Sequence, residues 1–187
     1  MSFSQGFFNL HINFSDIDNN IFEDKKERFI QHPEESLLYL SSRIYLYLLY
    51  FEEDVQFSKG LFEPLQPTIC IKNSKEQITK WVQLGEYHEN DLLHALRLDG
   101  LQVFNWYVFK EYSEHAVNLL RRMQSKINTK LKEKVEINLF LVSEENLIQE
   151  LINTRMEWTV MRSDNMLQII TKDEAMTEIN EPEQLQY

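Results

Sequence analysis

The chain has 187 residues, of which 30 are acidic and 19 are basic, so its formal charge is -11 with neutral histidines. A hydrophobic content of 43% excludes wholesale disorder, and the length suits one domain of ordinary size. The acidic balance argues against a general nucleic-acid coat protein, because neutralising phosphates requires surplus Lys and Arg. The single cysteine, Cys70, excludes a scaffold held by internal disulfides.

Neither a signal peptide nor a membrane-spanning segment is recognisable. The first six residues lack a basic region and a cleavage site. The longest apolar run, 44–51, has eight residues, whereas a spanning helix needs about 20. We therefore expect a cytoplasmic, soluble protein with no membrane partner.

The N-terminal third predicts a β-hairpin followed by a helix. Apolar residues alternate with polar ones from Phe8 to Phe14, which is typical of a half-buried strand. A polar turn separates this strand from a second one at 21–31. Pro33 suits the first position of a helix, and the acids after it suit the first turn, so we expect a helix over 34–50. Its residues are apolar on most sides, which predicts packing against a sheet.

The remaining elements alternate between strands and helices. The strands at 68–72 and 78–84 should pair antiparallel, and the apolar run 101–109 should be a central strand buried beside them. Further along we expect helices at 89–98, 112–126 and 144–153, a strand at 135–142, and a closing hairpin of 156–161 with 166–170. The fold class is mixed α/β: one domain over 1–171, with a mixed central sheet flanked by helices and an N-terminal hairpin. The acidic segment 172–187 should be a disordered tail.

Metal motifs are weak in this sequence. Asp16, Asp18 and Asn20 have the spacing of a calcium loop, but Ile21 stands where the sharp turn needs glycine, which favours a plain turn. The pair His88-Glu89 lacks the second histidine of a zinc protease.

A basic cluster leaves two interpretations open. Six of the 19 basic residues fall within 14 positions, and those at 121, 122, 126 and 130 are candidates for binding nucleic acid. Cations are also ordinary at helix C-termini, and no aromatic side chains interleave with these to stack on bases. We therefore favour the structural interpretation for Arg121, Arg122, Lys126 and Lys130.

Short motifs in fixed order resemble the YaeQ family. They are His32-Pro33-x-Glu35, Arg43, Tyr50, Glu53, Gln56 to Leu61, and Trp81-Val82-Gln83-Leu84-Gly85, with Asp16-x-Asp18-x-Asn20 upstream and Arg155-Met156 downstream. The resemblance spans most of the chain. It implies a fold similar to the PD-(D/E)XK, restriction-endonuclease-like superfamily, whose active members hold magnesium with carboxylates and stabilise developing charge with a lysine.

Carried over position by position, the resemblance implies a degenerate nuclease site. The acid of the first core helix is Glu35, which is also the one candidate metal ligand. At the two strand positions where active members have an acid, this chain has Thr68 and Gln83. At the position of the lysine it has Gly85, and at the alternative lysine positions on the next helix it has Leu93 and His94. One expected carboxylate therefore remains.

Two functions compete. A non-catalytic binding protein, with a protein as its partner and no cofactor, fits the substituted site and the charge of -11. The alternative is a metal-dependent phosphodiesterase using Mg²⁺ or Mn²⁺ in a rearranged site, in which Glu35, Glu63 or Glu86 acts with Gln83 and His94. We favour the first, with nucleic acid as a partner disfavoured by charge.

Overall fold

The computed structural model describes residues 6–51, 55–57, 65–130, 135–143, 148–163 and 166–187. The chain divides into two compact units, one formed by 1–52, 59–61 and 144–181, the other by 53–58, 62–143 and 182–187. Each unit is built on a mixed sheet. The predicted mixed α/β class is confirmed, but two sheets replace the single central sheet that we expected.

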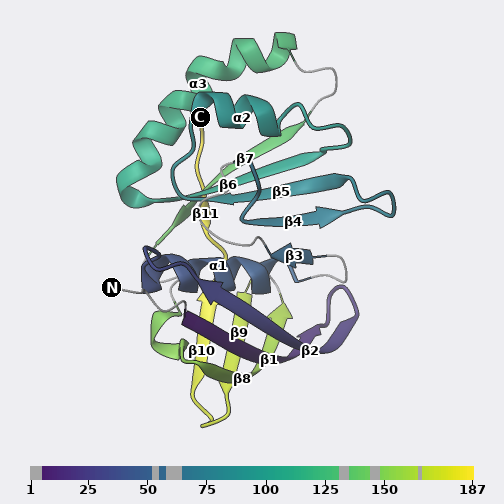
Figure 1. Ribbon diagram of the computed structural model, residues 1–187, viewed down its shortest axis with the longest axis vertical. Coiled ribbons are helices and arrows are strands. Elements are labelled where there is room, and N and C mark those ends of the chain that lie inside the picture. Colours follow the sequence, from purple (N-terminus) through teal and green to yellow (C-terminus); the bar gives the residue numbers. More distant parts are fainter. Residues whose placement is uncertain (1–5, 52–54, 58–64, 131–134, 144–147, 164–165) are drawn as a thin grey trace. The chain divides into compact units, whose positions relative to one another are not determined.

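The first unit joins the two ends of the sequence in a five-stranded sheet of order β10-β9-β8-β1-β2 (Figure 1). The N-terminal hairpin of β1 (Gly6–Asp16) and β2 (Ile21–Gln31) is confirmed, as is the closing hairpin of β8 (Arg155–Ser163) and β9 (Met166–Thr171). Strand β1 runs parallel to β8, which places the N-terminal hairpin inside a sheet. The unit also contains α1 (Leu37–Leu49), the short helix η2 (Gln149–Leu151) and β10 (Met176–Asn180).

Helix α1 packs on the apolar face of this sheet. The alternation in β1 buries Leu10, Ile12 and Phe14 on that face. Phe14 stacks on Phe51 just after the helix, with ring centroids 4.3 Å apart, and Phe29 of β2 meets Tyr47 edge-on at 5.6 Å. Residues 40–48 of the helix are all buried, as its apolar composition predicts.

The helix begins later than we predicted. Ser36 is the N-cap, and its side chain accepts a 3.1 Å hydrogen bond from the backbone N–H of Tyr39. Serine caps satisfy a helix N–H group that would otherwise lack a partner. The predicted start at Glu34 is therefore wrong, and Glu35 lies before the helix rather than in its first turn.

The second unit centres on a six-stranded sheet of order β11-β7-β6-β5-β4-β3. Its elements are β3 (Val55–Phe57), β4 (Ile69–Lys72), β5 (Ile78–Leu84), α2 (Glu89–Ala95), β6 (Val103–Phe109), α3 (Lys110–Lys130), β7 (Glu136–Val142) and β11 (Glu183–Gln184). The antiparallel pairing of β4 with β5 is confirmed. The apolar β6 is a buried strand beside β5, as predicted, and it runs parallel to β5 and to β7. Trp81, Phe104 and Trp106 form its core with one face of α3.

The C-terminal segment is not the disordered tail that we expected. Residues 176–180 form β10, which pairs with β9, and Ile179 is buried. Residues 183–184 form β11, which pairs with β7. The expectation failed because one buried isoleucine and main-chain pairing order the segment, and neither produces an apolar run in the sequence. Of the helix expected at 144–153, only the three-residue 3-10 helix η2 forms within the described residues 148–153; residues 144–147 lie outside the described part. No helix within the described ranges is long and apolar enough to cross a membrane.

Candidate functional site

The carboxylate of Glu35 is bonded to an arginine inside the first unit. Arg43 Nη1 lies 2.7 Å from Oε1 and 2.9 Å from Oε2, and both side chains are almost fully buried. The main-chain N–H of His32 donates to Oε2 at 3.1 Å, and Gln31 donates to the Glu35 carbonyl oxygen at 2.8 Å. Glu35 thus ties the turn before α1 to the middle of that helix.

The strand positions of the implied site lie in the second unit, and their polar atoms bond to nearby groups. Thr68 is buried just before β4, and its hydroxyl accepts a 3.0 Å hydrogen bond from the N–H of Leu84. The amide of Gln83 accepts from Trp81 Nε1 at 3.2 Å and donates to the Leu84 carbonyl oxygen at 3.2 Å. The Thr68–Leu84 bond holds the ends of β4 and β5 together, and the Gln83 bonds lie within β5.

The lysine position carries a glycine with a special backbone. Gly85 has a φ of 86°, in the left-handed region where a side chain is strained. Its N–H donates a 2.8 Å hydrogen bond to the main-chain carbonyl oxygen of Tyr107. Its own carbonyl oxygen accepts one from Trp106 Nε1 at 2.7 Å. Glycine at this place is therefore required by the turn after β5.

The alternative groups are dispersed. His94 is exposed on α2, whereas Leu93 beside it is buried. Glu86 is exposed after the β5 turn, and Glu63 lies outside the described residues. Among the residues that the structure describes, no three His, Cys, Asp or Glu side chains gather as a metal site would require.

These residues do not fit a magnesium or manganese ion. Magnesium is usually bound through one or two carboxylates together with waters and substrate phosphates. Glu35 already neutralises a buried guanidinium, and Thr68 and Gln83 are uncharged. No catalytic step is therefore derived through a metal.

The four basic candidates of α3 differ in their surroundings. Arg121 and Arg122 are exposed. Lys126 pairs with Glu89 of α2 at 2.6 Å, with both side chains about half exposed. The side chain of Lys130 lies outside the described part. Of these cations, Lys126 serves at least to join α2 to α3.

The loop with calcium-like spacing is held by an arginine. Asp16 is buried and accepts hydrogen bonds from the N–H and the amide of Asn19, at 2.9 and 2.8 Å, and from Arg162 Nε at 2.5 Å. Burial alone raises the pKa of Asp16, but the bonds from Asn19 and Arg162 outweigh it and hold this pKa below its ordinary value. Asp16 therefore belongs to the framework of the first unit.

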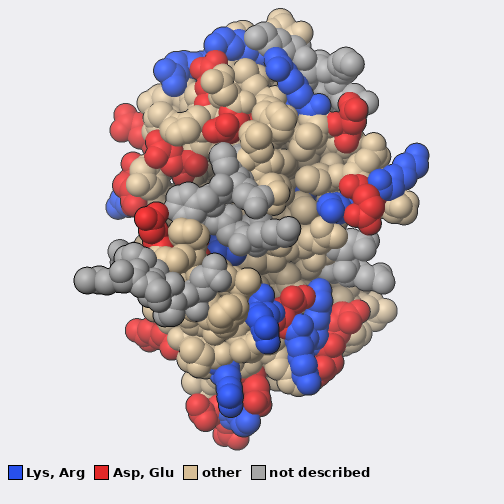
Figure 2. All heavy atoms as spheres, viewed as in Figure 1, with Lys and Arg blue, Asp and Glu red and all other residues tan. Residues whose placement is uncertain are grey.

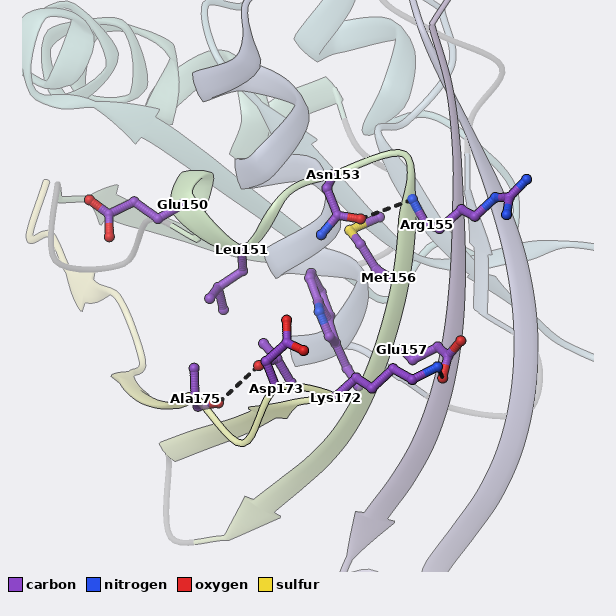
Figure 3. Close-up of a pocket in the computed structure, with 11 residues that line it drawn as sticks. Glu150, Leu151, Asn153, Arg155, Met156, Glu157, Lys172, Asp173 and Ala175 are labelled. Atoms are coloured by element: carbon purple, nitrogen blue, oxygen red, sulfur yellow. Dashed lines mark hydrogen bonds and ion pairs between the residues drawn. The ribbon is translucent and has the colours of Figure 1, made fainter.

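A pocket of about 290 Å³ lies in the first unit where β8 begins, and the sequence analysis missed it. Leu151 of η2 and Asp173 face one another across it, whereas Glu150 and Arg155 point away (Figure 3). Lys172 pairs with Glu157 at 2.9 Å on its margin. The sequence did not predict this pocket, because residues 172–175, which supply part of its lining, were expected to belong to a disordered tail. Its lining comprises Glu150, Leu151, Asn153, Arg155, Met156, Glu157, Trp158, Thr171, Lys172, Asp173 and Ala175.

The fold and these contacts define a mixed α/β protein whose buried charged side chains form its own framework. The family model described as "YaeQ protein" matches residues 1–180, and the chain belongs to that family. Its residues 32, 35 and 43, which carried the resemblance, are thus in contact through the Glu35 carboxylate.

Curated relatives of the chain are described as uncharacterized proteins. The chain is 31% identical over 74 residues to "Uncharacterized protein YaeQ" of Escherichia coli K12, and 30% identical over the same length to that of Salmonella typhi. In each case the alignment covers 40% of this chain and 41% of the relative.

Solved structures match over nearly the whole chain. The YaeQ protein from Pseudomonas syringae has a TM-score of 0.72 at 17% identity, covering 98% of this chain and 97% of that one. The YaeQ protein from Xanthomonas axonopodis pv. citri has a TM-score of 0.76 at 15% identity, covering 98% and 99%. These identities establish a shared fold only.

Proposed function

We propose that this YaeQ-family protein is a non-catalytic binding protein of the cytoplasm, built on a restriction-endonuclease-like core whose metal site has degenerated. The observation that carries the proposal is the buried bond between Glu35 and Arg43. Recruiting Glu35 to a metal would leave the Arg43 charge buried without its carboxylate. Breaking a buried pair in this way costs about 3–5 kcal/mol.

The other positions support the same conclusion. Thr68 and Gln83 offer no charge to a cation, and their polar atoms already bond to Leu84. A lysine at position 85 would need a left-handed backbone, which is strained for any residue with a side chain. Binding without chemistry requires none of these groups to move, and the net charge of -11 favours a protein over nucleic acid as partner.

Calorimetric titration of the purified chain with Mg²⁺ and Mn²⁺ tests this function. We expect no saturable heat for either ion and no metal-dependent cleavage of single- or double-stranded DNA and RNA. Glu34→Gln, an exposed acid beside the site, is the matched control for Glu35→Gln. Saturable binding and cleavage that Glu35→Gln abolishes and Glu34→Gln preserves would overturn the proposal and favour a phosphodiesterase.

A further inference from the structure

A row of polar side chains crosses three strands of the first unit. In the β1–β2 register Asn9 is opposite Arg28, and in the β1–β8 register Asn9 is opposite Arg155. Their neighbours Leu10, Phe29 and Met156 are buried against the core. Because side chains alternate along strands, the row lies on the outer face of the sheet, and all three of its members are exposed.

In the part of the chain that the structure describes, no carboxylate pairs with the cations of this row. Arg28 Nε donates to the neutral Asn9 Oδ1 at 3.2 Å. Within the described residues, Arg155 and Lys26 form no ion pair with an acid; Lys26 is opposite His11 in the next row. We name Arg28, Asn9 and Arg155 the cation row; Lys26 lies beside it, one row further along the sheet.

The acids on the same face are already engaged. Asp24 bonds to His11 at 3.0 Å, and Glu157 pairs with Lys172 at 2.9 Å. Figure 2 shows Lys and Arg side chains gathered over β1 and β2, with acids between them. In a chain of charge -11, a cluster of unneutralised cations is a local attraction for anions.

Strand β2 adds a free edge beside these cations. It pairs with β1 on one side. None of the described strands pairs with its other side at any of its eleven residues. Ile30, 38% exposed, and Phe7, 49% exposed, are opposite one another next to Arg28 on the outer face. A free edge supplies main-chain hydrogen bonds to an added strand, and alternate side chains supply specificity.

We propose that the β2 edge and the cation row bind an extended acidic peptide segment of a partner protein. The segment adds as a strand beside β2, its alternate acids face Lys26 and Arg28, and an apolar residue contacts Ile30. Opposite charges on neighbouring strands stabilise such pairing, whereas Lys26 and Arg28 on the outer face disfavour a basic strand. This inference rests on the proposed binding function and names its partner, through residues other than Glu35, Thr68 and Gln83.

The cation row favours a peptide over single-stranded nucleic acid. Neighbouring strands lie about 4.8 Å apart, so the row spans roughly 10 Å between the α-carbons of Arg28 and Arg155. Glu157 lies in the next row, level with Lys26, and Asp24 lies one row further on the same face. A longer polyanion would therefore meet carboxylates, whereas a strand added beside β2 needs acids only at Lys26 and Arg28.

Fluorescence anisotropy tests the proposal with a labelled peptide Thr-Val-Leu-Val-Glu-Val-Glu-Val-Thr, whose leucine and two glutamates share one face of the strand. The same peptide with both glutamates replaced by lysine, and labelled dT₁₀, are the comparison probes. We expect the acidic peptide to bind at least about tenfold tighter than either, and more weakly at high salt. The double variant Arg28→Glu/Arg155→Glu should weaken binding at least about tenfold. The matched double variant Arg121→Glu/Arg122→Glu, with the same change of charge on exposed residues of α3, should leave it within about twofold.

Main-chain pairing is tested separately by N-methylating alternate residues of the acidic peptide, which should abolish binding while preserving its charge. Circular dichroism confirms folding; where charge reversal unfolds the protein, Arg28→Gln/Arg155→Gln replaces it with the same expectation. The absence of saturable binding, equal losses in both double variants, or tighter binding of dT₁₀ would overturn the proposal. The peptide-binding results do not change the result expected from metal calorimetry. A failure of the peptide proposal can therefore be told apart from a failure of the proposed non-catalytic function.

Discussion

Arg162 binds Asp16 and the C-terminal end of α1 at the same time. Its Nε lies 2.5 Å from Asp16 Oδ2, its Nη1 lies 2.6 Å from the carbonyl oxygen of Leu49, and its Nη2 lies 3.4 Å from that of Phe51. The last carbonyl groups of a helix lack partners within the helix, and a cation there opposes the negative end of the dipole. One side chain from β8 therefore joins β1 to α1.

Replacing Asp16 with asparagine should lower the free energy of unfolding by about 2–4 kcal/mol, because the partly buried Arg162 charge loses its carboxylate. Urea unfolding followed by circular dichroism measures this loss. The control is Asp18→Asn, which changes an exposed acid in the same turn and should cost less than about 1 kcal/mol. Equal effects of the two substitutions would contradict the framework role of Asp16.

The contribution of Asp16 should also depend on pH. Burial by itself would raise the pKa of Asp16, but the hydrogen bonds from Asn19 and Arg162 lower this pKa by more than burial raises it. The folded pKa therefore lies below the unfolded value of about 3.9. A lowered folded pKa means that the stabilisation is complete above the unfolded pKa and is lost as pH falls through the folded one. Unfolding of wild type and Asp16→Asn between about pH 2 and 6 should show a difference that is constant above about pH 5 and shrinks below pH 4. A difference unchanged at the acid end would refute this linkage.

The Glu35–Arg43 pair should behave as a coupled unit. Glu35→Met or Arg43→Met alone should each cost about 3–5 kcal/mol, since each leaves a buried partner unmatched. The double variant Glu35→Met/Arg43→Met should lose clearly less than the sum, which a double-mutant cycle in urea measures. The exposed pair Lys72–Glu76, treated in the same way, should give a coupling below about 1 kcal/mol. Additive losses at Glu35 and Arg43 would show that the contact contributes nothing to stability.

Cys70 should be unreactive in the folded protein. Its side chain is buried on β4, and burial raises the pKa of the thiol despite the opposing charge of Lys72. Thiolate is the reactive form, so both access and ionisation are reduced. Reaction with a disulfide reagent at neutral pH should be at least about tenfold slower than in concentrated urea. Similar rates in the two conditions would show that β4 is open in solution.

Local patterns in the sequence determined the elements whose partners are close in the chain. Alternation identified β1, the short connection at 73–77 identified the β4–β5 hairpin, and the apolar run identified β6 as a buried strand. The ordered motifs were likewise sufficient for the family. In each case the responsible interaction spans few residues or repeats with the period of one element, so it is visible without a fold.

The tertiary structure alone decided the contacts between distant segments. Pairing of β1 with β8, and of β11 with β7, depends on which distant edges meet when the cores are buried, and no local period encodes it. The same holds for the candidate site: the sequence placed an acid at position 35, but only folding brought it onto Arg43 instead of leaving it in the first turn of a helix. The cation row arises in the same way, because Arg28 and Arg155 become neighbours only through the strand between them.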